Sequence, residues 1–150
     1  MKKLLIIAVV LFFSCSENKK PIVNSNVINS SGKIEVKNGK HENVTINYST
    51  NALEKPSFAD TYGKEPRIIR YDFFVNIVNQ SVNHARETCK YPLTFEPTKI
   101  GILIQEESEI YTIVDFIASN GFGVPIEGTI HIQFNKDKVI RVTDNLGNRF

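Results

Sequence analysis

Polar and apolar residues alternate over most of the second half of the chain. Four segments follow this period of two, and only short polar connections separate them. A period of two places successive side chains on opposite faces of a β-strand, and short connections favour antiparallel neighbours. The pattern predicts an antiparallel four-stranded meander formed by residues 99–105, 109–118, 122–134 and 138–143.

A different period marks residues 66–90. Apolar residues recur there at steps of three and four, from Ile68 to Cys89. This spacing forms one apolar stripe on a helix of about 3.6 residues per turn. Pro92 would end the helix, because the residue before a proline is driven out of the helical region. Residues 67–78 are rich in β-branched and aromatic side chains, so a strand at the start of this segment is the alternative.

The first alternating segment of the domain is residues 33–49, with Asn38-Gly39 near its middle. Asn-Gly between alternating segments is typical of a β-hairpin, because a type I′ turn needs a positive φ at both central residues. A longer turn through residues 40–43 is the alternative. The predicted fold class is therefore α+β, with one main helix packed on an antiparallel four-stranded meander and an N-terminal hairpin.

Two of the predicted strands carry apolar residues on both faces. Leu103, Tyr111 and Ile113 lie on the face opposite the one that the helix would cover. We expect the hairpin of residues 33–49 to cover this second face. The alternative is an open apolar face, which would mark an interaction site.

The chain begins with two lysines after Met1, followed by an unbroken apolar run over residues 4–13. The run is shorter than the roughly 20 residues that a membrane-spanning helix needs. It predicts a secretory signal peptide over residues 1–14, with a buried N-terminal helix or strand as the alternative. Residues 15–32 are rich in Asn and Ser and predict a flexible tether, with an ordered edge strand around residues 21–28 as the alternative. Residues 33–150 are predicted to form a single domain.

Ser14-Cys15 at the end of this run resembles the bacterial lipoprotein signal, in which a small residue precedes a cysteine. Phe12 and Phe13 stand where that family usually has leucine and a small residue. The resemblance implies that Cys15 is diacylated through its thiol and that the chain is cut just before it. Such acylation would anchor the domain to membrane lipid in the cell envelope. Ser16, in place of aspartate, implies the outer membrane rather than the inner one; simple secretion is the alternative.

The order of elements in the second half is similar to that of a small helix-plus-meander domain in bacterial and phage-encoded lipoproteins of uncharacterised function. The residues that carry this resemblance are Tyr91-Pro92-Leu93-Thr94-Phe95 after the helix and Asn120-Gly121-Phe122-Gly123 between two strands. The resemblance covers residues 81–143. It supports the predicted fold and implies no activity.

The charge balance argues against nucleic acid as a partner. The chain has 18 basic and 16 acidic residues, and two of the basic ones, Lys2 and Lys3, belong to the predicted signal peptide. The remaining chain is close to neutral and has no basic stripe with interleaved aromatic residues. Binding to nucleic acid needs clustered lysine and arginine to displace counterions.

Patterns typical of catalytic or metal sites are missing from the sequence. His41, His84 and His131 lie on three separate predicted elements, and no pair has the i, i+4 spacing of a helical metal site. Cys89 stands alone if Cys15 is lipidated, and its place at the end of the apolar stripe favours a buried, inert thiol. No serine lies in a Gly-x-Ser-x-Gly motif. The sequence predicts neither an enzyme nor a metal or cofactor site.

Three aromatic residues in predicted loops or turns are candidate interaction residues: Phe58, Tyr62 and Phe122. Phe122, flanked by two glycines, is predicted to plug into the core, and a projecting anchor is the alternative. The predicted function is a membrane-anchored, non-enzymatic binding or accessory module of the cell envelope, with membrane lipid at Cys15 and an envelope protein as partners. The alternatives are a protein inhibitor or immunity factor acting through exposed loops, and a hydrolase without a recognisable motif.

Overall fold

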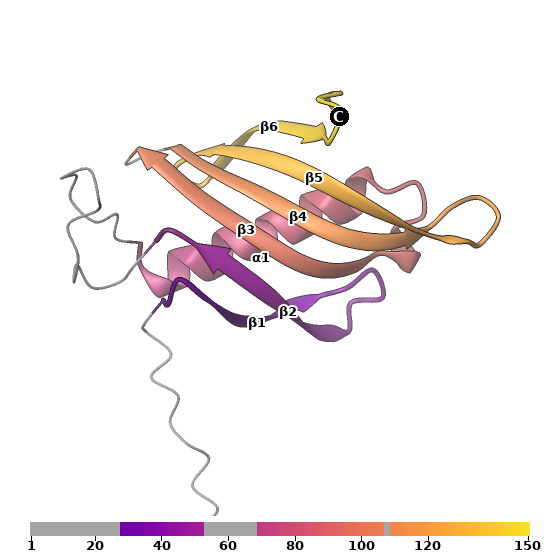
Figure 1. Ribbon diagram of the computed structural model, residues 1–150, viewed down its shortest axis with the longest axis horizontal. Helices are drawn as coiled ribbons and strands as arrows, with labels where there is room; N and C mark the ends of the chain where they lie inside the picture. The colour runs from indigo at the N-terminus through magenta and orange to yellow at the C-terminus, as the bar shows by residue number, and fades with distance from the viewer. Residues whose placement is uncertain (1–27, 53–68, 107–108) are drawn as a thin grey trace, which may run out of the picture.

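The computed structural model describes residues 28–52, 69–106 and 109–150. These residues form one six-stranded β-sheet with a long helix packed across one of its faces (Figure 1). The elements in chain order are β1 (Ser31–Lys37), β2 (Asn43–Thr50), α1 (Tyr71–Thr88), the short 3-10 helix η1 (Pro92–Thr94), β3 (Glu96–Glu106), β4 (Glu109–Ser119), β5 (Pro125–Asn135) and β6 (Lys138–Asp144).

The sheet has the order β1-β2-β3-β4-β5-β6 and is mixed. β2 and β3 run parallel, with Tyr48 opposite Ile100, and all other neighbouring strands are antiparallel. Two parallel strands that follow each other in the chain need a crossover connection rather than a tight turn. Here the connection from β2 to β3 includes α1. The predicted fold class, a helix on a four-stranded antiparallel meander with a separate hairpin, is therefore wrong. The described residues form mostly one mixed sheet.

The N-terminal hairpin extends the sheet instead of covering it. β2 pairs with the edge of β3 that the meander leaves free, and the pairing satisfies backbone groups that would otherwise need solvent. Ile34, Val36 and Ile46 of the hairpin join the core on the helix side. The prediction that the hairpin covers the second face of the sheet is therefore wrong. Within the described residues, no helix or strand covers that face (Figure 1).

The predicted bounds of the individual elements agree with the structure to within a few residues after Tyr71. The four strands of the meander form where the alternation places them. α1 begins at Tyr71 and ends at Thr88, ahead of Pro92. Ile69 and Arg70, which belong to the predicted helix, are not helical. Residues 66–68 of the predicted helix lie outside the described residues. The alternative of a strand in this region is wrong from Tyr71 onward.

α1 packs its apolar stripe against the sheet, and one polar pair lies inside this contact. Ser81 Oγ donates to the carbonyl oxygen of Ile77 at 2.7 Å and lies 2.8 Å from Thr112 Oγ1 of β4. Both side chains are at most 1% exposed. Because a buried hydroxyl without a partner is unfavourable, this pair helps to fix where α1 sits on the sheet. The buried residues of α1 are Phe74, Ile77, Val78, Ser81, Val82 and Ala85.

Three turns of the domain are built in the same way. The side-chain oxygen of one residue accepts hydrogen bonds from the backbone N–H groups two and four positions later. This residue is Asn38 between β1 and β2, Asn120 between β4 and β5, and Asp144 at the end of β6. The fourth residue of each turn has a positive φ. These fourth residues are His41, Gly123 and Gly147. The predicted type I′ turn at Asn38-Gly39 is therefore wrong, and the longer turn is confirmed.

The folded domain begins before its predicted boundary at Lys33. Ile28 is 2% exposed and belongs to the core. The Ser30 carbonyl oxygen accepts a hydrogen bond from the Thr50 N–H at 2.8 Å. The last residues of the predicted tether, 28–32, thus belong to the domain.

Candidate functional site

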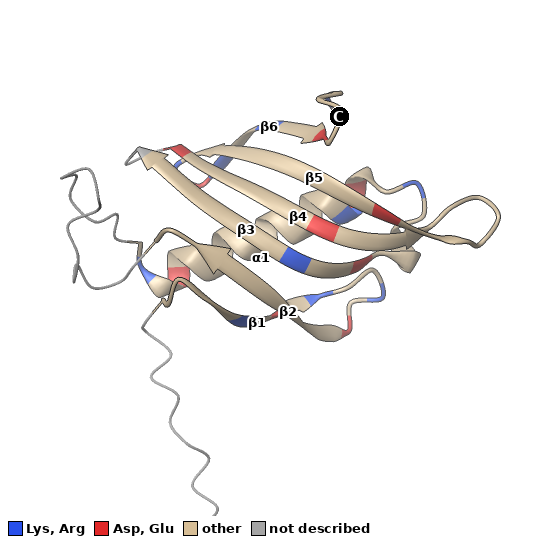
Figure 2. Ribbon diagram, viewed as in Figure 1, with Lys and Arg blue, Asp and Glu red and all other residues tan. Residues whose placement is uncertain are grey.

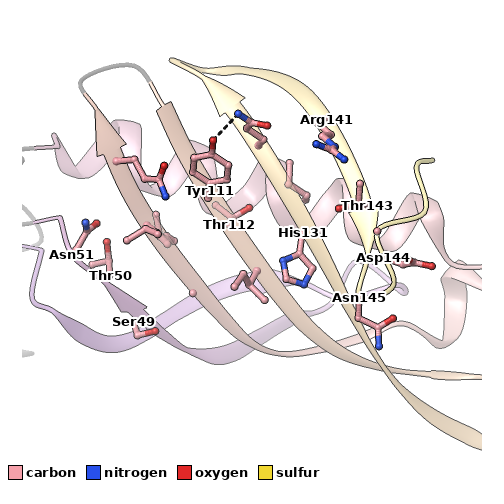
Figure 3. A pocket seen from close by; sticks show the side chains of 18 of the residues that line it. Ser49, Thr50, Asn51, Tyr111, Thr112, His131, Arg141, Thr143, Asp144 and Asn145 are labelled. Carbon is pink, nitrogen blue, oxygen red and sulfur yellow. Dashed lines mark hydrogen bonds between the residues drawn. The ribbon is translucent and has the colours of Figure 1, made fainter.

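The face of the sheet opposite α1 carries a groove of about 870 Å³ (Figure 3). The register of the strands brings its lining residues together from four or five strands at once. One row across the sheet contains Leu103, Tyr111, Gln133 and Arg141. The adjacent row contains Ser49, Gly101, Ile113, His131 and Thr143.

The floor of the groove is apolar and is hollowed by a glycine. Leu103 and Ile113 are 46% and 42% exposed, although both are large aliphatic residues in the middle of the sheet. A Cβ on Gly101 would meet Ser49 and Ile113 only at the ordinary contact distances of 3.8 and 3.9 Å. The missing side chain of Gly101 therefore leaves a depression open between them. An apolar floor with polar walls is typical of a ligand-binding surface.

Hydrogen bonds hold the polar walls of the groove. On one side, Asn51 Nδ2 donates to the Ile104 carbonyl oxygen and Asn51 Oδ1 accepts from the Ile104 N–H, both at 2.8 Å. On the other side, Gln133 Nε2 donates to the Tyr111 hydroxyl at 2.8 Å (Figure 3). The Tyr111 hydroxyl in turn donates to Glu109 at 3.4 Å. Side chains fixed in this way lose little conformational freedom when a ligand binds.

Arg141 and Asp144 are the charged residues that line the groove. The Asp144 carboxylate is used by its own turn: it accepts hydrogen bonds from the Asn148 side chain and from the N–H groups of Asn148 and Leu146, which hold the pKa of Asp144 below its usual value. Arg141 is exposed, and among the described side chains it has no ion-pair partner. Within the described residues, the groove thus presents a free cation beside an apolar floor.

The structure places one of the three predicted interaction residues. Phe122 lies in the turn between β4 and β5 and is 94% exposed. The prediction that it plugs into the core is therefore wrong, because this turn projects beyond the end of the sheet (Figure 1). The side chain projects, as the alternative expects, while its role as an anchor stays a prediction; Phe122 does not line the groove. Phe58, Tyr62 and Cys15 lie outside the described residues.

The remaining candidates for chemistry are dispersed. His41 lies in the first turn, His84 on α1 and His131 on β5, where it lines the groove. Burial raises the pKa of the Cys89 thiol to about 11, so the thiol stays protonated at neutral pH, which opposes a role as a nucleophile. Among residues 28–52, 69–106 and 109–150, no group of three or more His, Cys, Asp or Glu side chains could hold a metal ion.

Among the residues of the groove that sequence reasoning missed are Asn51, Gly101 and Arg141. The alternation of β6 does place Arg141 on the same face as Leu103 and Tyr111 once the strand register is known. Only the parallel pairing of β2 with β3 places Ser49 opposite Gly101 and brings Asn51 to Ile104. No local pattern in the sequence indicates that pairing.

Comparisons of the chain with protein-family models, with curated proteins and with solved structures gave no match. In the described part of the chain, no helix combines the length and the apolar content needed to span a membrane.

Proposed function

We propose that this chain is a lipid-anchored binding module of the cell envelope, and that the groove on the open face of the sheet is its ligand site. The observation that carries the proposal is the exposure of Leu103 and Ile113 in the middle of a six-stranded sheet. Burying apolar surface stabilises a protein by about 25 cal/mol per Å². Exposed aliphatic residues grouped on a hollowed face therefore favour a surface that a ligand covers.

The first fifteen residues support the anchoring part of the proposal. Cys15 follows an apolar run and a small residue, and twelve residues separate it in the sequence from Ile28, which is buried in the core. Several acyl chains on Cys15 would exceed the two signals that stable membrane attachment requires. The resemblance to the bacterial lipoprotein signal, with Ser16 after the cysteine, implies the outer membrane.

Acylation at Cys15 is tested by growing cells with an alkyne-bearing palmitate analogue and detecting the label on the purified chain. The chain has two cysteines, so Cys89→Ala is the matched control. We expect label on the wild-type chain and on Cys89→Ala, and complete loss of label on Cys15→Ala. An unlabelled wild-type chain, or label that survives Cys15→Ala, would rule out this anchor.

The lining of the groove favours an amphiphilic ligand with an anionic group. Its apolar part would cover Leu103 and Ile113, and its anion would pair with Arg141 across the sheet. β3 and β6 are separated by about 14 Å, three times the usual spacing of about 4.8 Å between strands, so the ligand would cross the strands. The groove volume of about 870 Å³ lies in the range of roughly 300–1,000 Å³ that is typical of small-molecule sites.

Two probes with the same twelve-carbon chain and opposite charge test this ligand class. We expect dodecyl phosphate to bind at least about tenfold more tightly than dodecyltrimethylammonium, because a hydrogen bond to a charged group contributes about 1.5–3 kcal/mol. The measurement is titration calorimetry on the chain from Ser16 onward, with both probes below the concentration at which they form micelles.

Matched variants separate the two parts of the site. Arg141→Gln should abolish the preference for phosphate, whereas Arg149→Gln, an exposed arginine outside the groove lining, should keep it. Gly101→Val should lower the affinity for both probes, because the new side chain would fill the depression in the floor of the groove. Equal affinity for the two probes in the wild type would refute an anionic ligand, and unchanged affinity in Gly101→Val would refute the groove as the site.

A further inference from the structure

The turn between β4 and β5 carries an apolar surface that is separate from the groove. We define the β4–β5 tip as residues 120–126. Phe122, Val124 and Ile126 in this tip are 94%, 54% and 50% exposed. The chain from Phe116 to Ile126 contains no charged residue, and the loop is uncharged throughout (Figure 2). An apolar cluster of this kind on a projecting turn is typical of an interaction surface.

Hydrogen bonds hold the tip in one shape. Asn120 Oδ1 accepts from the N–H groups of Phe122 at 2.9 Å and Val124 at 3.1 Å, and Asn120 N–H donates to the Val124 carbonyl oxygen at 2.8 Å. Next to the turn, the Ser119 N–H donates to Thr94 Oγ1 at 2.9 Å, which ties it to η1. A backbone that is already ordered costs little entropy on binding, so the part of the chain that presents the Phe122 ring is preorganised.

The position of the tip separates it from the N-terminal end of the domain. Residue 28 and the start of β1 lie at one end of the sheet, and the tip projects from the opposite end (Figure 1). The described start of the chain and the tip therefore lie at opposite ends of the sheet, and the tip does not adjoin the point where the domain continues toward Cys15.

Charges near the tip favour a protein over a lipid surface. Glu96 and Glu127 lie in one row across the sheet, on either side of Ile117, and both are exposed on the open face (Figure 2). Lys90, which follows α1, lies on the helix side of the sheet, with its Nζ 5.5 Å from the centre of the Tyr91 ring. Anionic lipid attracts clusters of lysine and arginine and repels carboxylates. In the next row of the open face, Lys99 lies opposite Asp115, so the charges of that row balance. The carboxylates of Glu96 and Glu127 therefore leave the open face beside the tip negative, which complements basic groups.

We propose that the β4–β5 tip docks into a protein partner that has an apolar pocket for the Phe122 ring, with basic residues at its border facing Glu96 and Glu127. A buried aromatic anchor supplies most of the affinity in such interfaces, and the charges at the rim select the partner and its orientation. This surface serves the binding of a macromolecule, and it does not depend on the ligand groove.

Site-specific photocrosslinking in cells that carry the full chain tests the proposal. Benzoylphenylalanine replaces Phe122 in one variant and Leu146 in a control. Leu146 is 80% exposed and occupies the same position in an identically built turn, with Asp144 in the place of Asn120. Both substitutions are at exposed residues, and thermal unfolding of each variant checks that the fold is kept. We expect one protein adduct of defined mass from position 122 and none of that mass from position 146.

Charge reversal then tests the chemistry of the partner. Glu96→Lys with Glu127→Lys should lower the yield of the adduct at least about tenfold, because like charges would then face each other across the interface. Glu35→Lys, an exposed change on β1, should leave the yield unchanged, and so should Arg141→Gln, which removes the cation of the groove. Lipid adducts, the same protein adduct from both positions, or no adduct would each overturn the docking proposal. A yield that does not respond to the double reversal would overturn the basic border.

Discussion

Replacing Phe74 with alanine is expected to lower the free energy of unfolding by about 3–5 kcal/mol. The Phe74 side chain is 1% exposed at the contact of α1 with the sheet. Its ring makes an edge-to-face contact with Tyr48 of β2, with the centroids 5.0 Å apart, and lies 6.4 Å from the ring of Tyr71. Removal of the ring loses the free energy gained from burying its apolar surface, and it leaves a cavity between the helix and the β1–β2 half of the sheet.

Denaturant unfolding followed by circular dichroism measures this loss, provided that the transition is two-state. Phe122→Ala is the matched control, because it makes the same chemical change at a side chain that is 94% exposed. Its effect should stay within about 0.5 kcal/mol. If Phe74→Ala costs less than about 1 kcal/mol, the packing of α1 on β2 described above is wrong.

The elements that the sequence predicted correctly are those in which one face is buried. Ile130, Ile132 and Phe134 of β5 are at most 3% exposed, while His131 between them is exposed. The period of two follows directly from that burial, whichever neighbours a strand has. The stripe of α1 follows in the same way from its contact with the sheet. Local periodicity therefore predicted the strands and the helix.

The position of the N-terminal hairpin could not be predicted in this way. Ile34, Val36 and Ile46 would be buried equally by a hairpin packed over the sheet and by one that extends it. The two arrangements differ in the backbone hydrogen bonds between β2 and the free edge of β3. Because nearly every residue carries the same backbone N–H and C=O groups, the sequence does not show where such hydrogen bonds form. The error in the fold class and the error about the second face have this single cause.

The candidate groove was partly visible in the sequence. Leu103, Tyr111 and Ile113 were predicted to share the second face, and an open face was the alternative to a covered one. The walls of the groove were not predicted, because Asn51 reaches Ile104 only where β2 lies beside β3. Arg141 joins the groove through the register of three strands, which no short motif encodes.

The role of Gly39 in the first turn was predicted for the wrong physical reason. A type I′ turn would need glycine for its positive φ, but in the turn of residues 38–42 the positive φ belongs to His41. Gly39 is buried where the hairpin turn meets η1, and its N–H donates to the Phe95 carbonyl oxygen at 2.9 Å. A Cβ at this position would collide with the carbonyl oxygen of Pro92. Glycine is needed here for the close approach of two backbones.

Gly39→Ala is accordingly expected to lower the free energy of unfolding by about 2–4 kcal/mol. Overpacking typically costs about 1–3 kcal/mol, and the hydrogen bond to Phe95 that the displaced turn would lose contributes about 1 kcal/mol. Neither backbone can rotate away as a side chain would, so the turn has to separate from η1. The loss should therefore appear together with faster amide exchange at Gly39, measured by hydrogen exchange.

Gly101→Ala is the matched control for this prediction. Its Cβ would meet its nearest neighbours at 3.8 and 3.9 Å, which is ordinary contact, so the effect should be small or slightly stabilising, within about 1 kcal/mol. Equal effects of the two substitutions would mean that Gly39 matters only through backbone entropy. The contact between the hairpin turn and η1 would then not be the tight one described here. A large loss at Gly39 alone would show that this contact holds the extended end of the sheet against the helix layer.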